Sequence, residues 1–248
     1  MRQPLVAGNW KMHGSAQSVS ELLGALVEGG VPEAVEVVVC PTYVHLPQAI
    51  DLCRASSVEV GAQDCSHAVE GAYTGEVAAP MIAELGCQWV IIGHSERRAY
   101  HGEGEDLISA KLKAAMAAGL KPIFCVGETR EQREADEAET VVAAQLRGAL
   151  ESVDTLAGLV IAYEPVWAIG TGLTATPQQA QDMHAFIRGE LAGLGVDPAA
   201  TRVLYGGSVK PGNAAELFAQ QDIDGALVGG AALVAEDFQA IVTAAVPE

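Results

Sequence analysis

Residues 159–172 read LVIAYEPVWAIGTG, and this stretch decides the fold. It begins as an apolar strand, Leu159–Tyr163, and places one carboxylate, Glu164, at the strand's C-terminal tip. Pro165 ends the strand because its nitrogen carries no hydrogen for the ladder. An apolar tip around Trp167 follows, between this proline and two glycines, which is typical of a lid that covers and desolvates a carboxylate. Taken alone, the stretch favours a simpler interpretation, namely a strand end, an N-capping Glu and an ordinary surface loop.

Seven further short apolar runs repeat the pattern and alternate with amphipathic stretches of helical period. Most runs are continuous, as in parallel strands covered on both faces. Eight strands, each followed by a helix, predict an α/β fold with one closed (β/α)8 barrel, a single catalytic domain over residues 1–248. An open doubly wound sheet is the alternative, but its G-x-G-x-x-G signal is missing, since residues 7–12 read AGNWKM. The predicted strands are Leu5–Asn9, Val35–Cys40, Val58–Gln63, Trp89–Gly93, Pro122–Val126, Leu159–Tyr163, Arg202–Tyr205 and Gly225–Val228.

Capping residues predict where two of the helices start. Ser18 and Glu21 form a capping-box pattern ahead of an apolar stripe. Thr176 and Gln179 form a second one, with Pro177 at the first helical position. The apolar stripes that follow are typical of core packing, and we assign them no function.

Composition excludes several classes of partner. The formal net charge of −18 argues against nucleic acid and anionic membranes, because both would be repelled. The five cysteines lack a C-x-x-C pair and predict buried thiols in a reducing compartment, with no disulfide and no metal site. There is no room for a signal peptide before the first strand and no apolar run long enough to span a bilayer. We therefore expect a cytoplasmic protein.

In a barrel, polar residues at the C-terminal ends of the strands share one rim, which is the working face of such enzymes. Glycine-rich turns after strands seven and eight expose backbone N–H groups that can hold a phosphate. Each turn alone fits an ordinary tight turn, but together they favour phosphate, with Lys11 adding local attraction. The residues at this rim are Asn9, Lys11, Gln63, His94, Ser95, Glu96, Glu164, Gly206, Gly207, Ser208, Gly229 and Gly230.

His94 stands between a strand and a predicted helix start. The positive end of that helix is expected to lower the pKa of His94 and keep the imidazole neutral at pH 7. A neutral imidazole still donates one N–H to a substrate oxygen. With the carboxylate of Glu164 and the cation of Lys11, the rim has the groups that move a proton beside a carbonyl on a small phosphorylated substrate.

The chain resembles the triosephosphate isomerase family along its whole length. The resemblance implies cofactor-independent and metal-independent interconversion of dihydroxyacetone phosphate and D-glyceraldehyde 3-phosphate, a step of glycolysis and gluconeogenesis. Other phosphate-binding barrels, such as a sugar-phosphate epimerase or lyase, and an inactive binding paralogue are the alternatives. The matching segments, in family order, are residues 7–12, 71–76, 92–98, 122–128, 162–172, 205–209 and 225–230.

The resemblance also implies roles for single residues. Glu164 would transfer the proton between neighbouring carbons, while Lys11, His94 and Asn9 stabilise the enediolate oxygens and Glu96 orients Lys11. The family is dimeric, so the loop around Thr74 is expected near the partner subunit's Asn9 and Lys11. Two departures from the family pattern are His13 and Leu173. The phosphate would be held by the N–H groups of Gly170, Ser208, Gly229 and Gly230, the apolar clamp would be Ile169 and Leu227, and Tyr205 would hold the lid shut.

Overall fold

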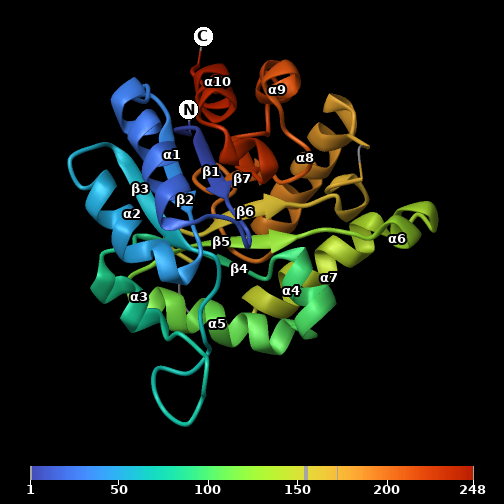
Figure 1. Ribbon diagram of the computed structural model, residues 1–248. Helices are drawn as coiled ribbons and strands as arrows, with labels where there is room; N and C mark the ends of the chain where they lie inside the picture. The colour runs from blue at the N-terminus through green and yellow to red at the C-terminus, as the bar shows by residue number, and fades with distance from the viewer. Residues whose placement is uncertain (1, 154–155, 172, 248) are drawn as a thin grey trace.

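Eight parallel strands close into a barrel, with β1 hydrogen-bonded to both β2 and β8 (Figure 1). The computed structural model describes residues 2–153, 156–171 and 173–247. Because the sheet closes on itself, the (β/α)8 prediction is confirmed and the open doubly wound alternative is wrong. The strands are β1 (Leu5–Asn9), β2 (Glu36–Cys40), β3 (Val58–Ala62), β4 (Trp89–Ile92), β5 (Lys121–Val126), β6 (Val160–Tyr163), β7 (Arg202–Tyr205) and β8 (Gly225–Val228).

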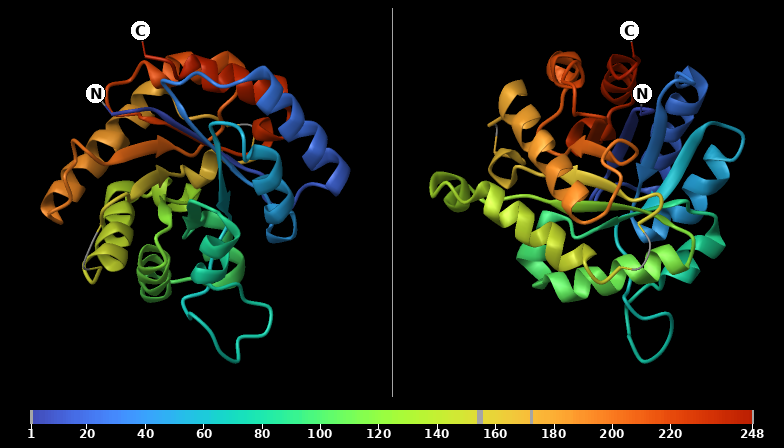
Figure 2. Two further views of the ribbon diagram at one scale, coloured as in Figure 1. Left: turned by 90° about the vertical axis from the view of Figure 1, so that its left-hand side faces the viewer. Right: turned by 180° about the vertical axis from the view of Figure 1, so that it is seen from behind.

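Helices surround the barrel, one or more after each strand (Figure 2). In the described residues, no helix is both long and apolar enough to cross a membrane. The α-helices are α1 (Ala16–Gly29), α2 (Leu46–Cys53), α3 (Ala79–Leu85), α4 (Ser95–His101), α5 (Glu105–Ala117), α6 (Arg130–Glu134), α7 (Ala138–Leu150), α8 (Pro177–Gly193), α9 (Pro211–Phe218) and α10 (Ala235–Ala244). The short 3₁₀ helices are η1 (Tyr43–His45), η2 (Val166–Ala168) and η3 (Gly230–Leu233).

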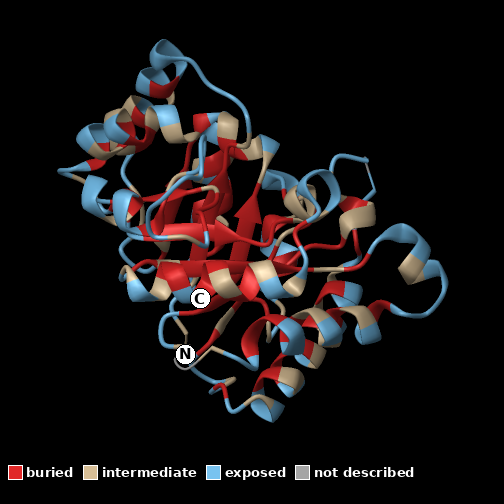
Figure 3. Cartoon of the chain, turned by 90° about the horizontal axis from the view of Figure 1, so that it is seen from below, coloured by how far each residue is buried: buried red, intermediate tan, exposed pale blue. Residues whose placement is uncertain are grey.

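The continuous apolar strands have two buried faces. Side chains such as Leu5, Ile91 and Leu204 fill the inside of the barrel. The residues that alternate with these along the strands, such as Val6 and Ile92, pack outward against the helices. Figure 3 shows the buried strands at the centre and exposed residues on the outer helix faces. Burial on both sides explains why these strands lack the apolar–polar alternation of a half-exposed sheet.

The N-terminal mouth of the barrel is closed by an indole and a ring of charges. Trp89 is fully buried, and its Nε1–H donates to Glu59. The ammonium of Lys121 lies 4.6 Å from the centre of the indole ring, and the Arg202 guanidinium lies 5.4 Å from it. Both cations also pair with Glu36. Solvent access to the barrel interior is therefore blocked at this end, opposite the C-terminal rim.

One of the two predicted helix starts is confirmed. Thr176 caps α8 and forms the expected reciprocal bonds with Gln179. The box predicted at Ser18 is wrong, because Ser15 caps α1 and Ser18 occupies the third helical position. The Ser18 hydroxyl accepts the Ser15 N–H at 2.8 Å, so a serine takes the place of the usual Glu or Gln and the helix starts earlier.

Candidate active site

A pocket of about 530 Å³ opens at the C-terminal ends of the strands. It gathers residues from β1, β4, β6, β7 and β8, although they are far apart in the sequence. Of the residues predicted at the rim, Gln63, Ser95 and Glu96 are not part of the lining, and Glu96 is bonded to the lining residue Lys11. The lining includes Asn9, Lys11, His94, Glu164, Ile169, Gly170, Gly206, Gly207, Ser208, Leu227, Gly229 and Gly230.

Glu164 follows β6 and is 2% exposed. Its Oε1 lies 2.8 Å from His94 Nε2, and its Oε2 accepts the Ser95 N–H at 2.9 Å. Burial acts to raise the pKa of Glu164, but the interactions with His94 and the Ser95 N–H outweigh burial and lower the pKa below 4.5. The carboxylate is therefore ionised and engaged with protein groups in this arrangement.

His94 is the N-cap of α4, as its place before a helix start predicted. Its Nδ1 accepts the Glu96 N–H at 3.2 Å, so the hydrogen of a neutral ring lies on Nε2, facing Glu164. The predicted lowering of its pKa is wrong here. Burial lowers the pKa of His94, but the carboxylates of Glu164 and Glu96 raise it above 6.5 overall. The negative charge of Glu164, 2.8 Å from His94 Nε2, raises this pKa more than burial and the dipole of the short helix lower it.

Lys11 is held in a left-handed backbone conformation, with φ of 51°. Gln63 maintains it by donating from Nε2 to the Lys11 carbonyl at 2.8 Å, and the Lys11 N–H donates to Asn9 Oδ1 at 3.0 Å. The Lys11 ammonium donates to Glu96 Oε1 at 2.5 Å. Strained non-glycine residues persist where the surroundings fix them, and often at functional sites. Lys11 is therefore a positioned cation and not a freely solvated one.

The glycine turns after β7 and β8 bring backbone close to the pocket. A Cβ on Gly206 would lie 2.9 Å from Glu164 Cγ, and one on Gly207 would lie 2.3 Å from the Tyr205 hydroxyl. Neither position can carry a side chain without displacement. Gly229 and Gly230 line the same pocket, where η3 begins. The two glycine turns therefore lie at one pocket, as expected for the anion site that the sequence predicted.

The lid segment after Glu164 begins with η2 and is anchored by Glu128. The Trp167 Nε1–H donates to Glu128 Oε1 at 2.8 Å, and the Tyr163 hydroxyl donates to the same oxygen at 3.0 Å. Arg133 pairs with Glu128 at 3.3 Å and lies 5.6 Å from the centre of the Trp167 ring. The tip residue Gly170 is exposed, with φ of +68°. Gly172, part of the predicted lid, lies outside the described residues.

Sequence reasoning did not predict the lining residues Lys210 and Asp237, and it missed Glu128 and Cys125 beside the site. Glu128 follows the end of β5 as Glu164 follows β6, so its position after a strand was an available signal. Cys125 is fully buried next to Glu164, and both burial and that carboxylate raise the pKa of its thiol. Nothing in an apolar strand distinguishes this cysteine. In the described ranges, no group of three or more His, Cys, Asp or Glu side chains is arranged to hold a metal ion.

Comparison with known proteins agrees with this geometry. The family model described as triosephosphate isomerase matches residues 4–245. The triosephosphate isomerase of Stenotrophomonas maltophilia (strain K279a) is 54% identical over 248 residues, with 99% of both chains covered. That of Ectopseudomonas mendocina (strain ymp) is 53% identical over 249 residues, again with 99% of each chain covered. That of Dechloromonas aromatica (strain RCB) is 54% identical over 99% of this chain and 100% of the relative. The chain belongs to the triosephosphate isomerase family.

Proposed function

We propose that the protein is an isomerase that interconverts dihydroxyacetone phosphate and D-glyceraldehyde 3-phosphate through an enediolate, without a cofactor, in glycolysis and gluconeogenesis. The observation that carries this proposal is the convergence of Glu164, His94 and Lys11, from three strands, in one pocket with two glycine turns. Family membership over residues 4–245 supports it. No observation favours another sugar-phosphate enzyme or an inactive paralogue.

Glu164 is the base in this proposal. Its present partners, His94 and the Ser95 N–H, are also groups that the substrate must approach. When substrate takes their place, the hydrogen bonds from His94 and the Ser95 N–H that lower the pKa of Glu164 are lost, whereas burial, which raises the pKa, remains. Closure of the lid over the carboxylate strengthens this effect by excluding water. The carboxylate thus becomes more basic when a carbon-bound proton is before it.

His94, Lys11 and Asn9 are proposed to stabilise the charge that develops on the two oxygens of the enediolate. The Nε2–H of His94 becomes a donor to substrate once Glu164 moves away, and the Lys11 ammonium supplies a positive charge. Asn9 already accepts the Lys11 N–H with Oδ1, which leaves its amide NH₂ for a substrate oxygen. Glu96 positions the Lys11 ammonium.

The backbone N–H groups of Gly170, Ser208, Gly229 and Gly230 are proposed to hold the phosphate. Gly170 belongs to the lid, whereas the other three belong to the turns after β7 and β8. Phosphate binding would therefore draw the lid tip over the pocket, because one of its ligands lies on the lid. Exclusion of water matters because an exposed enediolate would eliminate its phosphate.

A coupled assay with glyceraldehyde 3-phosphate tests the proposed activity. We expect turnover that is unchanged by a chelator, because the proposed steps use only side chains and backbone. A lyase or epimerase would leave the coupling enzyme without dihydroxyacetone phosphate. An inactive paralogue would bind phosphorylated compounds without turnover, and either result would contradict the proposal.

We infer that the protein is a homodimer that assembles through the loop at residues 66–77. This loop projects from the barrel between β3 and α3 (Figures 1 and 2), closed at its base by the Ser66 N–H to Val77 carbonyl bond of 2.8 Å. Val69 and Tyr73 on it are 59% and 46% exposed, and Met12 at the rim is 92% exposed. Exposed apolar groups of this size favour coverage by a partner.

Sedimentation equilibrium should give twice the 25.7 kDa mass of the chain. We expect Thr74→Arg to shift the protein toward monomer, because a long cation would enter the interface beside the partner subunit's Lys11. Thr140→Arg, on the exposed face of α7, is the matched control and should remain dimeric. If both variants sediment like the parent, the loop does not form the interface.

The remaining parts of the proposal concern domain organisation and location. We infer that the chain forms one catalytic domain, since the barrel uses strands from Leu5 to Val228. All five cysteines are free and buried, which is typical of proteins from reducing compartments and supports a cytoplasmic location.

A further inference from the structure

Four side chains with full charges line the pocket: Lys11, Lys210, Glu164 and Asp237. Lys11 is already paired with Glu96 at 2.5 Å. Lys210 is exposed and makes no ion pair with a carboxylate of the described residues. Of the two lysines in this lining, Lys11 is therefore neutralised by a bonded carboxylate and Lys210 is not.

The position of Lys210 relates it to the phosphate end of the pocket. It lies two residues after Ser208 and directly precedes α9, as the N-cap of that eight-residue helix. The positive end of the helix dipole adds to the charge of the ammonium there. Asp237 enters the same pocket from the first turn of α10, with the opposite charge.

The charge of the whole protein makes such a local cation important. With a formal net charge of −18, the protein repels a phosphate dianion at long range. Attraction must then come from charges within about one Debye length of the pocket mouth, roughly 8–10 Å at ordinary ionic strength. Of the pocket's charged side chains, Glu164 and Asp237 oppose the incoming dianion and Lys11 is offset by Glu96.

We propose that Lys210 guides the phosphate of the substrate into the pocket and that Asp237 opposes it, so that this pair sets the rate of capture. The inference rests on the proposed isomerase activity and extends it to residues outside the predicted site. Neither side chain is a catalytic residue, since neither is among the groups proposed to contact the reacting carbons. Substitution of either residue should therefore change kcat/KM at low salt and leave kcat nearly unchanged.

The test measures kcat and kcat/KM for Lys210→Gln and Asp237→Asn as ionic strength rises from about 0.01 M to about 1 M, where the Debye length falls from ~30 to ~3 Å. At low salt we expect Lys210→Gln to lower kcat/KM about 2- to 5-fold and Asp237→Asn to raise it by a similar factor. At high salt both variants should converge on the parent. Values of kcat should stay within about 2-fold throughout.

Two controls isolate the position of the charge. Lys113→Gln removes the same charge from the exposed face of α5, away from the pocket, and should follow the parent at every salt concentration. Lys210→Arg keeps the charge and should restore the salt dependence. If Lys210→Gln behaves like Lys113→Gln, or lowers kcat/KM equally at all salt concentrations, the guiding role is wrong.

Calorimetric titration with inorganic phosphate separates this inference from the isomerase proposal. At low salt Lys210→Gln should weaken phosphate binding and Asp237→Asn should strengthen it, whether or not the protein isomerises trioses. A protein that shows these affinity shifts but no turnover would contradict the isomerase proposal and support the role of Lys210. Turnover without any shift in phosphate affinity would support the isomerase proposal and contradict the role of Lys210.

Discussion

Replacing Glu164 with aspartate should lower kcat about 100-fold, because the shorter side chain withdraws the carboxylate by about 1 Å from the carbon-bound proton. A misplacement of this size at the reacting group typically costs about 2.7 kcal/mol in the activation free energy. The substitution keeps the charge and the chemical type of the base. Its effect therefore reports position alone.

The backbone cannot move to restore the lost methylene. The Glu164 N–H is bonded to the Val126 carbonyl at 2.7 Å. A Cβ on Gly127 would lie 1.7 Å from the Glu164 carbonyl oxygen, which shows how closely the two chains approach. On the other side, Gly206 lies against Glu164 Cγ. The segment is thus fixed by neighbours on both sides, and the loss in rate should not be recovered by relaxation.

Steady-state kinetics with the coupled assay, together with thermal unfolding, check this expectation. We expect the loss to appear in kcat, with the melting temperature little changed. Glu131→Asp makes the same shortening on the exposed face of α6 and should leave both quantities unaffected. A Glu164→Asp protein that keeps its rate but loses stability would show that Glu164 has a structural and not a catalytic role.

The sequence was sufficient for the fold and for bringing the strand-end residues to one rim, because both depend on where strands end. The predicted strands agree with the observed ones to within one residue at each end. Once the sheet closes, the strand ends define one rim, so Asn9, His94 and Glu164 had to meet there. Gly206 and Gly207 after β7 likewise mark backbone positions where an added Cβ would clash, whereas Gly229 and Gly230 after β8 have room for one.

The electrostatics of the site could not be predicted in the same way, because they depend on which side chains pair across long sequence separations. The helix start at His94 suggested a lowered pKa, but the Glu164 carboxylate at 2.8 Å reverses the direction. The bond from Trp167 to Glu128 joins residues 39 positions apart. A periodic pattern places each residue on an element but does not fix its rotamer or its partner.

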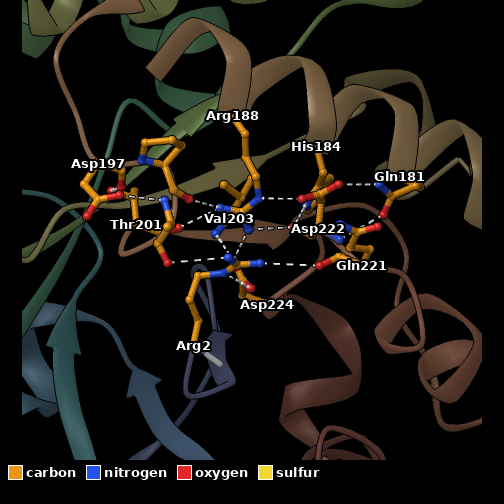
Figure 4. A network of polar contacts seen from close by, with 12 residues as sticks. Arg2, Gln181, His184, Arg188, Asp197, Thr201, Val203, Gln221, Asp222 and Asp224 are labelled. Carbon is orange, nitrogen blue, oxygen red and sulfur yellow. Dashed lines mark hydrogen bonds and ion pairs between the residues drawn. The ribbon is translucent and has the colours of Figure 1, made fainter. Parts of the chain in front are cut away.

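His184 gives the second large effect, which concerns stability in acid. It lies on α8 and is fully buried, in the polar network of Arg188 and Asp222 (Figure 4). Its Nδ1 is 3.2 Å from the Asp222 carbonyl, and its Nε2 has no hydrogen-bond partner in the part of the chain that is described. Its ring centre lies 5.9 Å from that of Tyr163. Burial, assisted by the charge of Arg188, lowers the pKa of His184 to about 3.

The sign of the effect follows from the lowered pKa. The unfolded chain binds a proton at this histidine below pH 6.5, whereas the folded chain does not until about pH 3. The folded state therefore loses stability as the pH falls from 6.5 toward 3, by about 1.4 kcal/mol per pH unit. At pH 5 the loss reaches about 2 kcal/mol, and it is absent at pH 7.5.

His184→Phe should remove this dependence. The phenyl ring can pack beside Tyr163, and the Asp222 carbonyl keeps its bond of 2.9 Å from Arg188 Nη2. Imperfect packing of the larger ring would shift stability by the same amount at every pH, so the slope is the informative quantity. Relative to the parent, the free energy of unfolding of His184→Phe should rise by about 2 kcal/mol between pH 7.5 and pH 5.

Urea unfolding at one fixed protein concentration measures this difference, since the stability of the proposed dimer would depend on concentration. His184→Gln also lacks a titrating ring and should follow the same slope despite its different packing. His101→Gln, an exposed histidine on α4, should run parallel to the parent. Carboxylates titrate alike in all four proteins, so their contribution cancels. If the free energy of unfolding of His184→Phe and of the parent changed in parallel with pH, His184 would accept a proton in the folded state as readily as in the unfolded state. The assignment of His184 as a buried neutral imidazole would then be wrong.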